Sequence, residues 1–204
     1  MVKTTEIDTA IQTLHTLNKS TGTPQTKGIS EDDLRELMPR HEALVEAIEM
    51  ARAAYEALEE EEKTLLKKSE KEVCIEVQKG YVNFYPAGGI NPYVPLAAKG
   101  PWIVTCHGAV LHDTGGYGMI GLGHNPPEVL EVLGTSHVMA NVMTPSLSQR
   151  RFTAALKKEI GHTRGECPFD RFICLNSGSE SVTVTTRIAD IHARNSVKEG
   201  GPHS

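Results

Sequence analysis

The stretch Asn176-Ser177-Gly178-Ser179-Glu180 decides how this chain is interpreted. The apolar run Phe172-Ile173-Cys174-Leu175 comes directly before it, and a segment with helical spacing follows it from Val182 to Ala193. This order predicts a strand, a short polar loop and a helix. A helix start presents unpaired backbone N–H groups and the positive end of the helix dipole, so the loop favours an anion such as phosphate.

Two interpretations of this loop stay open, and they are compatible. Ser177 and Glu180 have the S-x-x-E spacing of a capping box, which completes a helix start without any ligand. Alternatively, Gly178 lets the backbone come close to an anion, while Ser177 and Ser179 add hydroxyl donors. A capped helix start can also hold an anion, so the pattern alone does not choose between them.

Composition indicates a globular protein of one large domain or two small ones. The chain has 204 residues, of which 39% are apolar and 18 are glycine. Lys and Arg number 21 against 26 Asp and Glu, which gives a formal net charge of −5, and aromatic residues make up 5%. This acidic balance and the shortage of stacking rings speak against a nucleic-acid partner.

No apolar run approaches the roughly 18 residues of a membrane span, and the N-terminus shows no apolar core of a secretory signal. We therefore expect no membrane partner and a cytoplasmic location, with organellar import left open. The four cysteines, Cys74, Cys106, Cys167 and Cys174, form no C-x-x-C motif. They are expected to be buried thiols in a reducing compartment.

The chain divides into four segments by composition and predicted secondary structure. Residues 1–29 are rich in Thr, Ser, Gly and Lys and are expected to be a mobile lead-in with a short helix from Ile7 to Leu17. Residues 30–72 are helical, with a start at Ser30 and a long helix from His41 to Lys68. That long helix carries an apolar stripe, which is expected to pack on the same chain; the alternative is an interaction helix. The stripe comprises Leu44, Ile48, Ala51, Tyr55 and Leu58.

The second half of the chain has shorter predicted elements. In residues 73–135 we expect a hairpin of two strands, 102–105 and 109–111, then a glycine loop at 115–118 and a helix from Pro126 to Leu133. In residues 136–204 we expect a helix from Leu147 to Ile160, the strand 172–175, and a last helix that ends near Asn195.

Two other patterns do not carry a function. Gly116-Tyr117-Gly118-Met119-Ile120-Gly121 satisfies G-x-G-x-x-G, but a helix does not open on it and no acid follows about 20 residues later, as a dinucleotide site requires. His107, His112 and His124 have no metal-ligand spacing, so no metal is predicted. The nucleophile elbow G-x-S-x-G is also absent.

Several motifs, taken in order, resemble class III aminotransferases, which are pyridoxal-phosphate enzymes of fold type I. The matching stretches are Leu111-His112-Asp113-Thr114-Gly115-Gly116-Tyr117-Gly118, Gly121-Leu122-Gly123-His124-Asn125-Pro126-Pro127-Glu128-Val129, Phe172-Ile173-Cys174-Leu175-Asn176-Ser177-Gly178-Ser179-Glu180-Ser181, and Thr186-Arg187-Ile188-Ala189. The resemblance covers about residues 85–204.

The resemblance implies an α/β fold: the N-terminal part of a fold type I enzyme, with a helical lead-in, small-domain strands and the start of the large-domain sheet. By resemblance, residues 73–135 belong to the small domain and 136–204 begin an incomplete cofactor-binding domain. Ser177, Gly178 and Ser179 would hold the phosphate of pyridoxal 5′-phosphate, and the loop 86–92 would lie near the substrate entrance. The implied partners are a small amino donor, a 2-oxo acid and a second copy of the intact parent, which would be a homodimer.

The sequence also departs from the family pattern. Ser181 stands where the family has alanine, and the following segment is rich in threonine. No lysine here matches the Schiff-base position, and neither the partner of the pyridine nitrogen nor the ring-stacking residue can be assigned, so no catalytic residue is predicted. The chain alone is therefore expected to be inactive. An alternative is a non-catalytic fragment that acts as a binding or assembly module.

Overall fold

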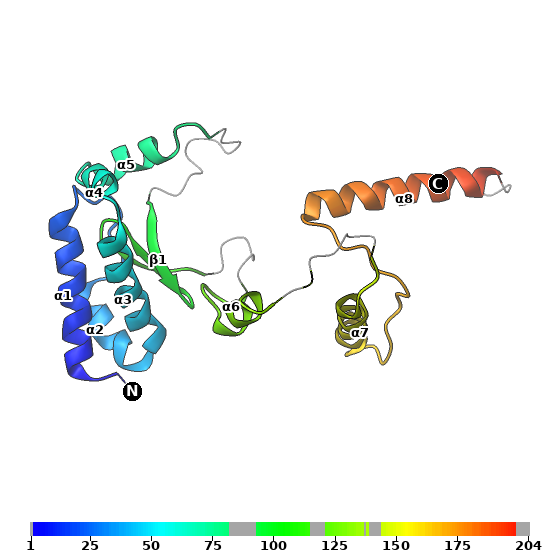
Figure 1. Ribbon diagram of the computed structural model, residues 1–204, viewed down its shortest axis with the longest axis horizontal. Coiled ribbons are helices and arrows are strands. Elements are labelled where there is room, and N and C mark those ends of the chain that lie inside the picture. The colour runs from blue at the N-terminus through cyan, green and yellow to red at the C-terminus, as the bar shows by residue number, and fades with distance from the viewer. Residues whose placement is uncertain (1, 82–92, 115–120, 137, 139–143, 199–204) are drawn as a thin grey trace. The chain divides into compact units, whose positions relative to one another are not determined.

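The computed structural model describes residues 2–81, 93–114, 121–136, 138 and 144–198 (Figure 1). The chain forms two compact units, Met1–Ser136 and His137–Ser204. It belongs to the mixed α/β class, as expected, with many helices and a small antiparallel sheet.

Helices dominate the first unit, which also contains a three-stranded sheet. The helices are α1 (Thr4–Ser20), α2 (Glu31–Leu37), the 3₁₀ turn η1 (Met38–Arg40), α3 (Glu42–Ala57), α4 (Glu60–Leu66), α5 (Glu70–Val77) and α6 (Pro127–Leu133). The strands are β1 (Pro95–Lys99), β2 (Trp102–Thr105) and β3 (Val110–His112), and they pair antiparallel in the order β1-β2-β3.

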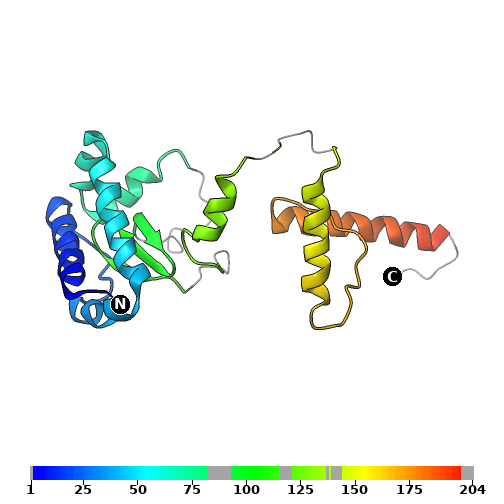
Figure 2. The same ribbon diagram turned by 60° about the horizontal axis from the view of Figure 1, so that its bottom comes forward.

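The core of this unit lies between α3, its neighbour α1 and the sheet. Helix α3 packs against β1 and β2 and lies beside α1 (Figure 2). Most of the predicted apolar stripe faces this core: Leu44, Ile48 and Ala51 are fully buried, and Tyr55 is half-buried against them. Trp102 and Val104 of β2 complete the same cluster. Leu58, also half-buried, packs against a second small cluster of Leu66, Val73 and Cys106. The stripe is therefore confirmed as an intramolecular packing face.

Helix α1 corrects the expectation of a mobile lead-in over residues 1–29. It spans Thr4–Ser20, longer than the predicted helix, and its face of Ile7, Ile11 and Leu14 is buried in the core. The segment is mostly polar, and its apolar residues are few, so its composition did not predict a buried face. The apolar residues are nevertheless spaced to lie on one side of a helix.

The predicted long helix is interrupted. Helix α3 ends at Ala57, and α4 begins after Glu59, whose backbone N–H donates to the Glu62 carboxylate at 2.9 Å. This capping box starts a new helix within the acidic run. The prediction of one helix from His41 to Lys68 is therefore wrong at this point, whereas the predicted start at Ser30 is confirmed by its side chain, which accepts from the Asp33 N–H at 3.2 Å.

The predicted hairpin is confirmed, with Trp102 opposite His112 and Val104 opposite Val110. Strand β1 was not predicted, and α5 carries the helical region past residue 72. The predicted helix near 126–133 is confirmed as α6, with proline in its first turn.

The second unit contains α7 (Leu147–Gly161) and α8 (Gly178–Lys198), close to both predictions. The expected strand at 172–175, and with it the start of a large-domain sheet, is wrong for the part of this unit that the structure describes. These residues pair with no neighbouring strand there, and Ile173 and Leu175 are 65% and 40% exposed. An apolar run becomes a strand only where another strand accepts and donates its ladder of hydrogen bonds.

None of the helices in the described ranges is both long enough and apolar enough to cross a membrane.

Candidate functional site

The predicted capping box is present at the start of α8. The Ser177 hydroxyl oxygen accepts from the Glu180 backbone N–H at 3.2 Å. In return, Glu180 Oε2 accepts from the backbone N–H groups of Asn176 at 3.0 Å and Ser177 at 3.1 Å. The structure thus places Ser177–Ser179 at the helix start, as the sequence predicts.

The cap leaves donors for an anion. Among the described residues, no protein acceptor binds the backbone N–H of Gly178, the backbone N–H of Ser179 or the Ser179 hydroxyl. A Cβ at Gly178 would meet nothing within 4 Å, so the space beside this backbone is open. Two amides and one hydroxyl at a helix N-terminus fit the oxygens of a phosphate group.

Glu180 sets the electrostatics of this helix start. Its carboxylate occupies two of the loop N–H groups and places a negative charge beside the remaining donors. The helix dipole favours an anion there, whereas the carboxylate repels a second one. The site can therefore hold a phosphate, but against a local like charge.

The threonine-rich segment after the loop forms a regular helix because its hydroxyls bond to the preceding turn. Thr183 donates to the Ser179 carbonyl at 3.0 Å, Thr185 to the Ser181 carbonyl at 2.8 Å, and Thr186 to the Val182 carbonyl at 3.0 Å. These bonds satisfy the hydroxyls within the helix itself.

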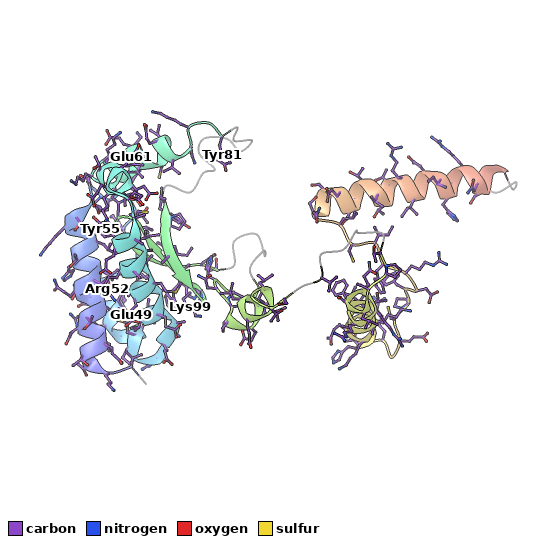
Figure 3. The ribbon with its side chains drawn as sticks, in the orientation of Figure 1. Glu49, Arg52, Tyr55, Glu61, Tyr81 and Lys99 are labelled. Carbon is purple, nitrogen blue, oxygen red and sulfur yellow. The ribbon has the colours of Figure 1, made fainter. Side chains whose placement is uncertain are left out.

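Apolar side chains of the second unit stay exposed. Side chains project from both sides of α8 (Figure 3), and Val182, Ile188 and Ile191 are 67%, 53% and 59% exposed. The described part of this unit thus combines a helix start that has free donors with several exposed apolar side chains.

The other predicted features have separate environments. The loop 86–92 and most of the glycine loop, residues 115–120, lie outside the described residues. His107 Nε2 lies 3.1 Å from the Lys68 carbonyl oxygen, His112 packs edge-on against Trp102, and His124 Nε2 lies 3.0 Å from Asp113 Oδ2. Across the part of the chain that the structure describes, no group of three or more His, Cys, Asp or Glu side chains is arranged to hold a metal ion.

The cysteines differ more than predicted. Cys106 is buried, and burial together with the nearby Glu70 carboxylate raises the pKa of its thiol to about 11. Cys74 and Cys167 are partly buried and Cys174 is exposed, so of the four thiols expected to be buried, Cys106 alone is. Cys174 lies in the segment that does not form a strand and therefore gains no cover from a sheet.

Sequence reasoning missed one polar group in the first unit. Glu70 is fully buried, and its Oε2 accepts from the backbone N–H groups of Gln25 at 2.6 Å and Thr26 at 2.7 Å. Glu70 lies some 45 residues from its hydrogen-bond partners in the sequence, so no local pattern predicted these contacts. Gln25 and Thr26 also line a cavity of the first unit.

Comparisons of the chain with protein-family models, with curated proteins and with solved structures found no match.

Proposed function

We propose that this chain is the N-terminal portion of a fold type I, class III aminotransferase and that the start of α8 holds the phosphate of pyridoxal 5′-phosphate. The observation that carries the proposal is the set of donors left by the cap: the N–H groups of Gly178 and Ser179 and the Ser179 hydroxyl. The ordered motifs from Leu111 to Ala189 support the same family.

In this proposal the intact parent moves an amino group between an amine or amino acid and a 2-oxo acid, as a homodimer. When bound, the cofactor supplies an electron sink for negative charge that develops on the substrate carbon. The residues of this chain bind and orient the phosphate end. The Schiff-base lysine, the acid on the pyridine nitrogen and the ring-stacking residue belong to positions that this sequence does not match.

The test uses a protein that contains this chain together with the lysine-bearing remainder. Gly178→Val combined with Ser179→Ala should weaken binding of pyridoxal 5′-phosphate by about tenfold or more, because a hydrogen bond to a charged group is worth about 1.5–3 kcal/mol. Thr185→Ala is the matched control, since it removes a hydroxyl from the same helix away from its start. Absorbance titration gives both affinities.

A second titration isolates the phosphate. Pyridoxal, which lacks this group, should bind the double variant and the unmodified protein equally. If the double variant keeps its full affinity for pyridoxal 5′-phosphate, the loop is a helix cap and nothing more.

The alternative is a non-catalytic binding or assembly module, and the exposed apolar side chains of α8 favour it, because they need a covering surface. The intact mass of the natural protein separates the two. A mass well above 22.2 kDa, with a lysine-bearing continuation, supports the enzyme, whereas a mass of 22.2 kDa supports the module.

A further inference from the structure

A cavity of about 400 Å³ lies in the first unit between α1, the segment that precedes α2 and the turn between β2 and β3. Its walls include the apolar side chains of Ile11, Leu14, Ile29 and Val110. The segment that precedes α2 is hydrogen-bonded to the sheet, because the Ile29 N–H donates to the Val110 carbonyl at 2.9 Å. The size falls within the usual range for small-molecule sites, which is roughly 300–1,000 Å³.

The buried carboxyl group of Glu70 lies directly behind one wall of this cavity. Thr26 lines the cavity, and its backbone N–H donates to Glu70 at 2.7 Å. Glu70 is fully buried, its Oε1 has no hydrogen-bond partner, and no Lys, Arg or His in the described ranges forms an ion pair with it. A buried carboxylate without a cation is costly, so a positive group nearby would be stabilising.

The neighbouring polar atoms also need a donor. His107 lines the cavity and is 1% exposed, and its Nε2 lies 3.1 Å from the Lys68 carbonyl oxygen. Because a carbonyl only accepts, Nε2 carries the hydrogen, which makes Nδ1 of the neutral ring an acceptor. This Nδ1 and the Thr26 hydroxyl oxygen are both buried without a partner. Polar atoms without a partner therefore lie behind the inner wall of the cavity.

We propose that this cavity binds a small molecule with a primary ammonium group on an apolar body. An ammonium group offers three donors and the missing positive charge, whereas the apolar body fits the walls formed by Ile11, Leu14 and Val110. The three unpaired polar atoms are closed to solvent in this structure. The proposal therefore includes a local rearrangement of the cavity wall at Thr26 that lets the ammonium contact them.

The charges at the rim are compatible with this ligand. Glu31 lines the cavity and contacts His15 at 2.8 Å and Arg35 at 3.0 Å, so its charge is shared with two groups of the chain. Lys27 also lines the cavity, but its side chain is exposed, so water screens its repulsion of a cationic ligand. The proposal stands independently of the cofactor site on α8.

The experiment compares three ligands that differ in one end group. Pentylammonium chloride, 1-pentanol and sodium pentanoate are titrated into the ¹⁵N-labelled 204-residue chain while the amide signals of Gly28, Gly108 and Ala109 are followed. Pentylammonium should give saturable shifts, pentanol should bind about tenfold more weakly or worse, as expected for loss of a charged hydrogen bond, and pentanoate should give no saturable shift. Equal binding of the alcohol, preferred binding of the carboxylate, or no saturable shift with the amine overturns the proposal.

Two variants then locate the ammonium. Glu70→Gln should weaken pentylammonium by about tenfold, and Thr26→Val by a smaller factor, since the first removes a charge and the second a neutral hydroxyl. Glu76→Gln is the matched control, because it removes a carboxylate from the same helix that is paired with Lys79 at 2.6 Å. Full affinity in both site variants contradicts the assignment.

A readout on the histidine keeps the test decisive if Glu70→Gln does not fold. In the unmodified chain, the His107 Nδ1 signal in a long-range ¹H–¹⁵N spectrum should shift on addition of pentylammonium, because Nδ1 gains a donor. An unchanged Nδ1 signal at saturation would exclude this inner side of the cavity as the binding place.

Discussion

At the scale of single residues, the helix cap and the proposed anion site use different atoms of one loop. Ser177 Oγ and Glu180 Oε2 close the cap, whereas the N–H groups of Gly178 and Ser179 remain available. The two interpretations that the sequence leaves open are therefore compatible in the structure. They also interact, because the capping carboxylate carries the same sign of charge as a phosphate.

This interaction gives a prediction for Glu180→Gln. A glutamine oxygen can still accept from the loop N–H groups, but the repulsion between like charges disappears, which is worth about 1 kcal/mol for two charges 4 Å apart in water. We expect the affinity for pyridoxal 5′-phosphate to rise severalfold in the lysine-complete protein, measured by absorbance titration. Asp190→Asn, farther along the same helix, should change nothing; a weaker affinity in Glu180→Gln would mean that the cap geometry matters more than its charge.

The thiols provide a second residue-scale prediction. Burial raises the pKa of Cys106 from 9.0 to about 11, so at pH 8 its reactive thiolate is rare as well as covered. Iodoacetamide should label the exposed Cys174 well before Cys106, as read by peptide mass over time. Comparable rates for both thiols at pH 8 would show that the first unit opens readily.

The same pKa has a consequence for stability. The unfolded thiol loses its proton near its ordinary pKa of 9.0, while the folded thiol keeps it until about pH 11. The favourable contribution of the neutral buried thiol is therefore complete below pH 9 and declines as the pH rises toward 11.

At the scale of elements, several helices were predicted from local start signals, although the capping box that starts α5 at Ser69 was missed. Ser30 and Ser146 each cap a helix within three residues, and α6 begins with its prolines. The helix break at Glu59 was missed because an acidic run looks like a continuous solvated face. The strand predicted at 172–175 failed because strand formation depends on a partner that a local pattern does not contain.

The candidate sites divide in the same way. The capping box at Ser177 and Glu180 is a pattern of four residues, so the sequence predicted it fully. The cluster of Glu70, Thr26 and His107 joins three distant segments and depends on burial, which no spacing rule reports. Long-range polar contacts of this kind form only when the folded helices and sheet bring the three segments together.

The close packing of the segment between α1 and α2 on Val110 can be tested by substituting Gly28, with Gly80 as a control outside the segment. Gly28 has φ +65°, and a Cβ there would lie 2.9 Å from Val110 N and O; Gly80 has φ +88°, with nothing within 4 Å of its Cβ. Gly28→Ala should lower the free energy of unfolding by about 1–3 kcal/mol more than Gly80→Ala. Both alanines are strained by the left-handed backbone, but only the alanine at position 28 also clashes with Val110. Urea denaturation measures the difference; equal losses would mean that Val110 gives way at no cost.

At the scale of the whole molecule, the two units differ in how far their apolar side chains are buried. In the first, α1, α3 and the sheet share a buried core. In the second, side chains such as Phe152, Ile173 and Ile188 are more than half exposed. This contrast agrees with both proposals, because either further parts of an enzyme or the partner of a binding module would cover these side chains.

The aminotransferase proposal also predicts that the 204-residue chain alone catalyses no transamination. Lys157 and Lys158 lie on α7, and neither matches the Schiff-base position of the family. Without that lysine there is no covalent attachment of the cofactor at the site. The purified chain is assayed with pyridoxal 5′-phosphate, an amine donor and a 2-oxo acid, then reduced with borohydride; turnover, or a stoichiometric cofactor–lysine adduct within residues 1–204, would contradict the assignment.

The central claim is that the start of α8 binds a phosphate ester, and the most direct measurement is an amide-shift titration of the ¹⁵N-labelled chain. Pyridoxine 5′-phosphate and pyridoxine are compared because neither carries the aldehyde that reacts with lysines. The account predicts saturable shifts at Gly178 and Ser179 with the phosphate ester and none with pyridoxine. Equal responses to both compounds, or shifts that leave Gly178 and Ser179 unaffected, would contradict it.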